Sequence, residues 1–263
     1  TMSNNNVNNL IAVSDGDDRA GTATWWRLDS IVSTDKLEQA WRDAGLPEDN
    51  LPQHTTPTQA LKRALQTHTG KDDATGGKIL LRPLGKGNWA LVHEQVDSDA
   101  QELDYTKKLV AGIDENGTPR FHPEWHPLVE SLQQAYDAAL ETFDHTAMSH
   151  WLCKLVVKAD SIPLRDGGGI YFIPPTCTGF WRKVADVVKE ASFCKVYTMP
   201  VMKTDDAIAA ALDGLMEDTQ KKLDAISDEV VQDMSLRGLA TRRDRCDGLL
   251  ERLESYEGLL GSS

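Results

Sequence analysis

The pattern of apolar and polar positions predicts one strand, then two helices, and then a group of strands. A strand is expected over residues 23–28, and a helix follows, with Asp35 and Glu38 spaced as a capping box and Gly45 placed to stop it. Thr56, Pro57 and Gln59 form the N-terminal signature of a second helix. The period then changes from helical to alternating, which predicts an antiparallel meander of three or four strands. The apolar runs are 78–84, 89–96, 103–113 and 119–122, and Asn116-Gly117 is a hairpin signal between the last two.

The middle of the chain alternates between helices and strands. Helices are expected over 127–143, 146–158 and 179–191, a hairpin over 162–173 and a strand over 194–201. The hairpin turns at Asp166, which three glycines follow: Gly167, Gly168 and Gly169. We expect them to form a structural turn in which at least one has a positive φ, because glycine adopts that conformation without steric cost.

The last 60 residues carry helical spacing almost throughout. Their first half has apolar positions about 3.7 residues apart: Ile208, Leu212, Leu215, Thr219, Leu223, Ile226, Val230 and Met234. Their second half has the 3-4-3-4 spacing of a coiled-coil seam: Cys246, Leu249, Leu253, Tyr256 and Leu260. This spacing leaves charged residues such as Arg252 and Glu254 off the seam. A break at 235–238 favours a hairpin folded on itself. The alternative is one continuous helix of roughly 85 Å that needs a partner.

These elements predict an α+β fold. It consists of an antiparallel meander and hairpin with packed helices, followed by a long C-terminal helical hairpin or coiled coil. Along the sequence we expect a disordered lead at 1–9 and an α+β domain at 10–126. A helix-hairpin-helix-strand segment at 127–203 and a helical coiled-coil element at 204–263 follow. No apolar run approaches the ~18–20 residues needed to cross a bilayer, so no membrane partner is expected.

Composition and charge narrow the class of protein. The chain has 263 residues, of which 40% are hydrophobic, and a net charge of −13. These values are typical of an ordinary globular protein, and the negative charge argues against general binding to nucleic acid. The charge is uneven, because residues 145–203 carry eight basic and four acidic side chains. The four cysteines have no zinc-binding spacing, and no signal peptide precedes them, so we expect reduced thiols in a cytoplasmic protein.

The basic segment offers a candidate nucleic-acid surface. Two helices followed by a glycine-turned hairpin match the order of elements in the second half of a winged helix, where the later helix reads DNA. The candidate contacts are Lys154, Lys158, Arg165, Arg182 and Lys183. The predicted reading helix carries two of these cations among several core-type residues, which favours ordinary packing with solvated lysines. Nucleic acid is therefore an open but disfavoured partner.

Two groups of side chains have metal-ligating chemistry. His122, Glu124 and His126 alternate along a short stretch, and His150 and Cys153 share one face of a predicted helix. The first group lies among prolines instead of on a helix, and the second lacks a third ligand. We therefore expect no metal and no cofactor. The Asp166 glycine turn lacks the lysine and the hydroxyl residue of a phosphate-binding loop.

Three stretches of the chain resemble an uncharacterised protein family carried by phages and plasmids. They are Ala44-Gly45-Leu46 with the later Arg63-Ala64, Leu164-Arg165 with the run from Gly168 to Pro174, and the run from Tyr256 to Gly261. The resemblance implies a bacterial or phage-infected cell and a mobile-element or defence context. It implies no activity and no catalytic residues.

Three hypotheses of function follow. The leading one is a non-enzymatic interaction, scaffold or accessory protein that assembles with itself or a protein partner through its C-terminal coiled coil. The first alternative is a nucleic-acid-binding accessory protein that uses residues 145–203. The second is a metal-dependent enzyme built on the two histidine groups.

Overall fold

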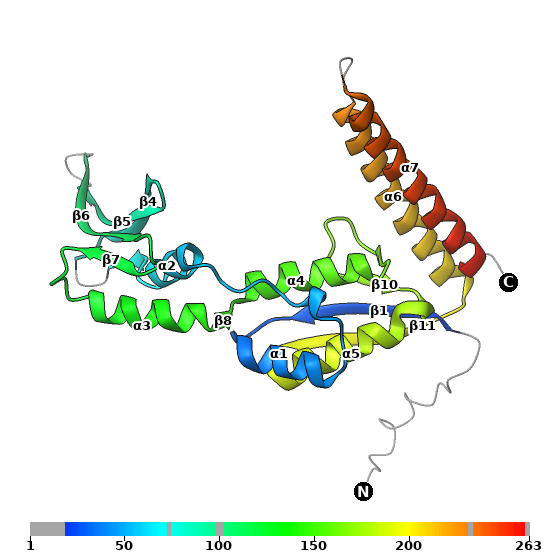
Figure 1. The fold of residues 1–263 in the computed structure, drawn as a ribbon, viewed down its shortest axis with the longest axis horizontal. Helices are drawn as coiled ribbons and strands as arrows, with labels where there is room; N and C mark the ends of the chain where they lie inside the picture. The colour runs from blue at the N-terminus through cyan, green and yellow to red at the C-terminus, as the bar shows by residue number, and fades with distance from the viewer. Residues whose placement is uncertain (1–18, 73–74, 98–101, 231–233, 261–263) are drawn as a thin grey trace, which may run out of the picture. The chain divides into compact units, whose positions relative to one another are not determined.

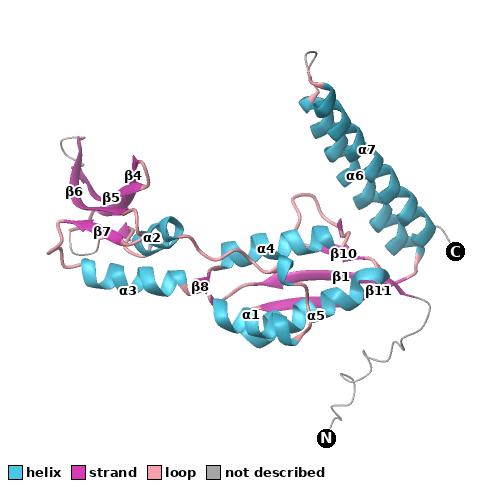
Figure 2. Cartoon of the chain, viewed as in Figure 1, coloured by secondary structure: helices cyan, strands magenta, loops and turns pink. Residues whose placement is uncertain are grey.

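The computed structural model describes residues 19–72, 75–97, 102–230 and 234–260 (Figure 1). Its helices, antiparallel sheets and C-terminal helices confirm the predicted α+β fold (Figure 2). The chain forms two compact units. Of the described residues, unit 1 combines those within 19–27, 152–189 and 194–260, and unit 2 combines those within 28–151 and 190–193. The predicted lead at 1–9 lies outside the described residues, and the division at 126 and 203 stays a prediction.

Unit 2 begins with a short strand pair and two capped helices. Strand β2 (Val32–Ser33) pairs with β8 (Thr142–Phe143), and α1 (Thr34–Asp43) follows β2 directly. The predicted capping box of α1 is wrong, because the N-cap is Ser33 and the Glu38 carboxylate instead pairs with Arg42. The glycine stop is confirmed, since Gly45 has φ +62° just after the C-cap.

Helix α2 (Pro57–Gln66) has the predicted capping box. The Thr56 hydroxyl accepts a hydrogen bond from the Gln59 backbone N–H, and the Gln59 side chain accepts one from the Thr56 N–H. A short 3-10 helix, η2 (Glu48–Asn50), lies between α1 and α2. Each of the two reciprocal bonds satisfies a backbone N–H that the start of the helix would otherwise leave unpaired.

The predicted meander of three or four strands is confirmed as antiparallel, and the sheet has a fifth strand, β3 (Gly70–Lys71), that was not predicted. The strands lie in sequence order: β3, β4 (Lys78–Gly85), β5 (Asn88–Asp97), β6 (Glu102–Ile113) and β7 (Pro119–His122). Leu91 pairs with Leu81 on one side and Leu109 on the other, so the three side chains share one face. Gly117 has φ +81° in the turn between β6 and β7, as the Asn-Gly signal predicts.

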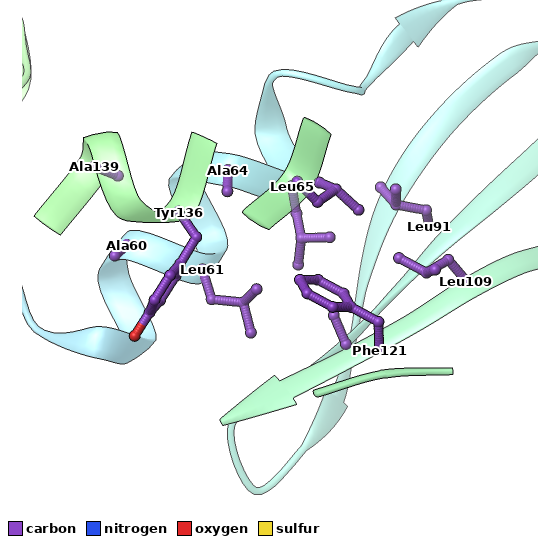
Figure 3. Close-up of a cluster of buried hydrophobic side chains, with 11 residues drawn as sticks. Ala60, Leu61, Ala64, Leu65, Leu91, Leu109, Phe121, Tyr136 and Ala139 are labelled. Carbon is purple, nitrogen blue, oxygen red and sulfur yellow. The ribbon is translucent and has the colours of Figure 1, made fainter. Parts of the chain in front are cut away.

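Helices α2 and α3 (Val129–Leu140) cover that face of the sheet (Figure 3). Leu61, Leu65, Leu132 and Leu91 are fully buried there. The predicted start of α3 at Pro127 is wrong, because the His126 ring nitrogen Nδ1 accepts the Leu128 N–H and the helix begins after this turn. Its predicted end is also too late, since residue 143 belongs to β8.

Helix α4 (His145–Lys158) begins in unit 2 and ends in unit 1. The Asp144 carboxylate accepts the Ala147 backbone N–H at 2.8 Å, which caps its first turn. In unit 2, the ring of Trp151 lies 5.4 Å from that of Trp41, and its indole N–H donates to the Asn50 carbonyl. These contacts hold the middle of α4 against α1 and η2.

Unit 1 is built on a four-stranded sheet whose strand order is β11-β1-β10-β9. Strands β1 (Arg19–Arg27), β9 (Ile162–Pro163), β10 (Tyr171–Ile173) and β11 (Lys195–Met202) are antiparallel to each neighbour. Helix α5 (Pro175–Ala191) connects β10 to β11. It starts four residues before the prediction, because proline is well accommodated at the first position of a helix.

The C-terminal helices are α6 (Asp205–Glu229) and α7 (Leu236–Leu260), which lie side by side in Figure 1. Thr204 caps α6 by accepting the Ala207 N–H, and two aspartates follow in the first turn, where the helix dipole favours negative charge. Among the described helices, none is both long and apolar enough to cross a membrane.

Candidate interaction surface on the C-terminal hairpin

Helices α6 and α7 form an antiparallel hairpin within one chain. The Arg252 guanidinium lies 2.6 Å from the Asp218 carboxylate, and near the other end Arg245 lies 2.7 Å from Glu229. Facing residues therefore have numbers that sum to about 470. The hairpin interpretation is confirmed, and the continuous helix is excluded for this chain. The predicted break at 235–238 is instead the first turn of α7, where the Ser235 hydroxyl accepts the Gly238 N–H.

One end of the hairpin, which we call the base, packs on the sheet of unit 1. Tyr256, Leu260, Ala211 and Leu215 are buried in one cluster with side chains of the sheet. The Tyr256 ring lies 6.5 Å from the ring of Phe172 on β10. The base comprises residues 205–217 and 249–260. The remaining described residues, 218–230 and 234–248, form the tip.

Arg252 fastens the base to the loop that precedes β9. Its guanidinium donates to the Asp160 carboxylate at 2.8 Å, to the Asp218 carboxylate at 2.6 Å and to the Ser161 carbonyl at 2.6 Å. The Tyr256 hydroxyl donates to the Asp160 carbonyl. Burial raises the pKa of this hydroxyl well above its ordinary value, so Tyr256 remains a donor. The expectation that Arg252 is an off-seam charge is wrong, because its side chain is 12% exposed.

The burial of the predicted seam residues increases along α7 towards its C-terminal end. Tyr256 and Leu260 are buried, whereas three others are half-buried: Cys246, Leu249 and Leu253. On α6, Leu215, Thr219 and Ile226 are buried, but Leu212 remains 38% exposed. Helix α7 therefore leaves part of the apolar stripe of α6 uncovered, because a stripe that drifts around the helix is wider than one neighbouring helix can cover.

The uncovered part of this stripe forms an apolar groove between the two helices. Its volume is about 290 Å³ and its lining is Leu212, Leu215, Met216, Leu250, Leu253, Glu254 and Glu257. Met216 is 61% exposed and Leu250 is 58% exposed. The two glutamates form its rim on the α7 side.

Exposed apolar side chains continue from the groove towards the tip. They are Leu223, Val230, Leu236 and Leu239. Leu223 lies seven residues, or about two helical turns, from Met216, so both lie on one side of α6. A row of this length on a helix surface is typical of a docking site for other helices.

The basic candidates lie on three elements of the structure. Lys154 and Lys158 are exposed on α4, Arg165 is exposed in the loop between β9 and β10, and Arg182 and Lys183 are exposed on α5. The expected hairpin is present, but β10 lies between β9 and β1 in the sheet of unit 1. It is thus part of a four-stranded sheet instead of a projecting wing.

The turn after Asp166 has a left-handed backbone conformation that glycine adopts without steric cost. Gly167, Gly168 and Gly169 have φ values of +76°, +78° and +94°. Asp166 before them accepts a hydrogen bond from Lys221 on α6 at 2.5 Å, and this bond lowers the pKa of the Asp166 carboxyl. The turn therefore contacts the hairpin.

The metal candidates are dispersed. His122 and Glu124 are exposed, and the Nδ1 atom of His126 is already a hydrogen-bond acceptor. On α4, His150 is exposed and the Cys153 sulfur lies 3.7 Å from the Tyr171 hydroxyl. In the part of the chain that the structure describes, no three histidine, cysteine, aspartate or glutamate side chains are grouped as a metal site. The four cysteines are free thiols.

Sequence reasoning missed the outward groove and the Arg252 contacts. The sequence did hold a signal for the Arg252 contacts, because Arg252 is the single basic residue among residues 249–260, which include three glutamates. The groove had no such signal, because the same apolar pattern describes covered and uncovered positions alike.

Comparison with known proteins gives one match. A model of a family of unknown function (DUF6744) matches residues 20–263. No curated protein and no solved structure matches the chain. The match covers every described element except the first residue of β1. The chain therefore belongs to this family of unknown function.

Proposed function

We propose that this protein is a non-enzymatic interaction or accessory protein that assembles through the outward face of its C-terminal hairpin. The observation that carries the proposal is the apolar groove between α6 and α7, with Met216 and Leu250 more than half exposed. Fully burying an exposed leucine or methionine side chain is worth roughly 1.5–3 kcal/mol, and the part of this free energy that belongs to the exposed fraction is not realised in the single chain. A docked helix would recover it.

The construction of the hairpin supports this role. Its base is fastened by Arg252 and Tyr256, so the groove is presented by a rigid support. We extend the proposal to a coiled-coil mode of packing, because the seam of α7 has the 3.5-residue spacing that this mode requires. The sequence resemblance supports a phage, plasmid or defence setting, and the free cysteines support a cytoplasmic one.

A photo-crosslinking experiment tests the proposal. A benzophenone amino acid replaces Leu250 in the full chain, which is expressed in its natural cellular setting and irradiated. We expect one dominant adduct, either a second copy or one reproducible other protein, identified by peptide mass spectrometry.

The matched control places the same amino acid at Glu251, which is exposed on the adjoining side of α7. It should give little adduct. Equal adduct from both positions, or none from Leu250, would refute assembly through the groove.

A second candidate function is nucleic-acid binding by the basic segment. The observation in its favour is that Lys154, Lys158, Arg165, Arg182 and Lys183 are all exposed. Binding of labelled DNA that weakens steeply with salt, and weakens further when Lys154 and Arg182 become glutamate, would support it. Binding that these changes leave intact would refute it.

A further inference from the structure

We infer that the groove of the hairpin binds a second copy of this chain, docked tip to base about a two-fold axis near Leu250. The inference rests on the proposed function, because it assumes that the outward face of the hairpin is the docking surface. It adds the identity of the partner and the orientation in which that partner docks.

Helix α7 carries a self-complementary charge pattern on this face. Arg243 and Glu257 are each seven residues from Leu250, one towards the tip and one towards the base. Seven residues are about two helical turns and ~10 Å, so the three side chains lie on one side of α7. Leu250 and Glu257 line the groove together, and the Arg243 side chain is 82% exposed. From tip to base, this side of α7 therefore presents a cation, a leucine and an anion.

Helix α6 carries an apolar pattern with the same centre. Since facing residues sum to about 470, Leu250 lies level with Gln220. Met216 and Leu223 are close to equal distances on either side of that level. One two-fold axis at this level, perpendicular to the helices, would thus place Arg243 opposite Glu257 of the second copy. It would also place Met216 opposite Leu223, and each pairing would occur twice.

The distribution of charge selects this orientation. The base carries seven acidic residues and one basic residue, whereas the tip carries six of each. Docking with both bases at one end would bring two strongly negative segments together, which costs free energy. Docking tip to base separates them. An interface in which each copy uses the same patch is also the commonest way in which proteins form dimers.

The length of the hairpin permits the arrangement. With the axis level with Gln220, the last residue of α6, Glu229, would reach the level of residue 211 in the second copy. Helix α6 begins at Asp205, so the tip stops before the end of the partner's helix. The contact between the α6 helices is therefore confined to the two hairpins.

Molar mass measured by light scattering and sedimentation across protein concentrations tests the inference on the full chain. We expect a concentration-dependent dimer. Leu250→Asp places a charge on the axis in both copies and should raise the dissociation constant at least a hundredfold. Its far-UV circular dichroism should match that of the parent, because the leucine is 58% exposed in the single chain.

Charge reversal tests the orientation. Arg243→Glu and Glu257→Arg each create two like-charged pairs and should each raise the dissociation constant about tenfold. The variant with both changes restores opposite charges and should return close to the parent value. An equimolar mixture of the two single variants should form a mixed dimer tighter than either variant alone. Glu251→Arg, an exposed change on another side of α7, is the matched control and should leave the dimer unchanged.

Three results would overturn the inference. The first is a parent protein that stays monomeric at about 100 μM, and the second is a dimer that Leu250→Asp leaves intact. The third is a pair of charge variants whose own dimers are as tight as the parent dimer and which form no mixed dimer. In each case the benzophenone at Leu250 separates this failure from that of the proposed function. An adduct with another defined protein keeps the proposed function and excludes the second copy, whereas no adduct rejects both.

Discussion

At the scale of single residues, the Thr24 hydroxyl makes two hydrogen bonds that connect a strand of unit 1 to two other elements. Thr24 is fully buried on β1, where its oxygen accepts the Trp181 indole N–H at 2.8 Å and its hydroxyl donates to the Tyr197 carbonyl at 2.8 Å. One side chain thus links strand β1 to α5 and to β11. A buried polar group without a partner is costly, so this link depends on the hydroxyl itself.

We expect Thr24→Val to destabilise the protein by about 1–3 kcal/mol, because it leaves a buried donor and a buried acceptor unpaired without changing the side-chain volume. Thr24→Ser keeps the hydroxyl and should cost clearly less. Urea denaturation followed by tryptophan fluorescence measures both. Equal losses for the two variants would show that the methyl group matters and the hydroxyl does not.

Gly168 is a second residue at which a side chain would strongly affect stability, because its position has no room for a Cβ atom. It has φ +78°, and a Cβ atom built there would lie 2.8 Å from the Tyr171 hydroxyl. We expect Gly168→Val to cost about 1–3 kcal/mol through backbone strain and this contact. The control is Gly179→Ala on α5, where a Cβ meets no atom within 4 Å, and it should be neutral or stabilising. Thermal melts in which both variants match the parent would refute a constrained turn.

At the scale of elements, Asp218 links the two helices of the hairpin. Burial tends to raise the pKa of the Asp218 carboxyl, but hydrogen bonds from Lys222 and Arg252 outweigh burial and hold the pKa below its ordinary value. A lowered pKa means that folding favours the ionised form. This contribution to the free energy of unfolding is complete above the unfolded pKa of about 4 and is lost as pH falls through the folded value.

We expect Asp218→Asn to destabilise the protein by about 1–3 kcal/mol at pH 7, because charge-assisted hydrogen bonds are lost. The difference from the parent should shrink as pH falls below about 4. Urea denaturation at pH 7, 5, 4 and 3 measures it. Asp213→Asn, an exposed change on the same helix, should stay within about 0.5 kcal/mol of the parent at pH 7. A difference for Asp218→Asn that grows on acidification would contradict the assignment.

At the scale of the whole molecule, each unit has a cluster of buried side chains that joins its sheet to helices. The cluster in unit 2 joins the meander to α2 and α3, and the cluster in unit 1 joins its sheet to the base of the hairpin. Leu109 on β6 is fully buried in the first cluster (Figure 3). Close-packed interiors respond strongly to the loss of such a side chain.

We expect Leu109→Ala to destabilise unit 2 by about 2–5 kcal/mol, through lost burial and the cavity left behind. Amide hydrogen exchange should accelerate in β5 and β6, which the leucine joins. Leu103→Ala removes the same atoms from a side chain on the same strand that is 55% exposed, and it should change little. Exchange that accelerates equally for both variants would contradict the placement of this core.

The sequence by itself determined the elements whose signals are local. The capping box at Thr56, the Asn-Gly turn at Gly117 and the glycine stop at Gly45 each act within a few residues, so they were predicted and confirmed. The alternating runs predicted the meander for the same reason, since neighbouring strands joined by short turns pair with each other. The helix end predicted near Phe143 was wrong because a tertiary contact, the pairing of β8 with β2, competes with helical spacing there. The start predicted at Pro127 was two residues early because of the turn at His126.

Only the tertiary structure decided which distant segments pair and which apolar side chains stay uncovered. Strand β1 pairs with β10 and β11, more than 140 residues away, and no local pattern encodes that choice. Arg252 has the composition of a surface residue, yet three acceptors from two other segments surround it. Leu260 and Leu250 have the same apolar character, but Leu260 is buried against the sheet and Leu250 lines an open groove. Periodicity reports that a side chain avoids water. Whether anything covers it depends on contacts between segments far apart in the chain.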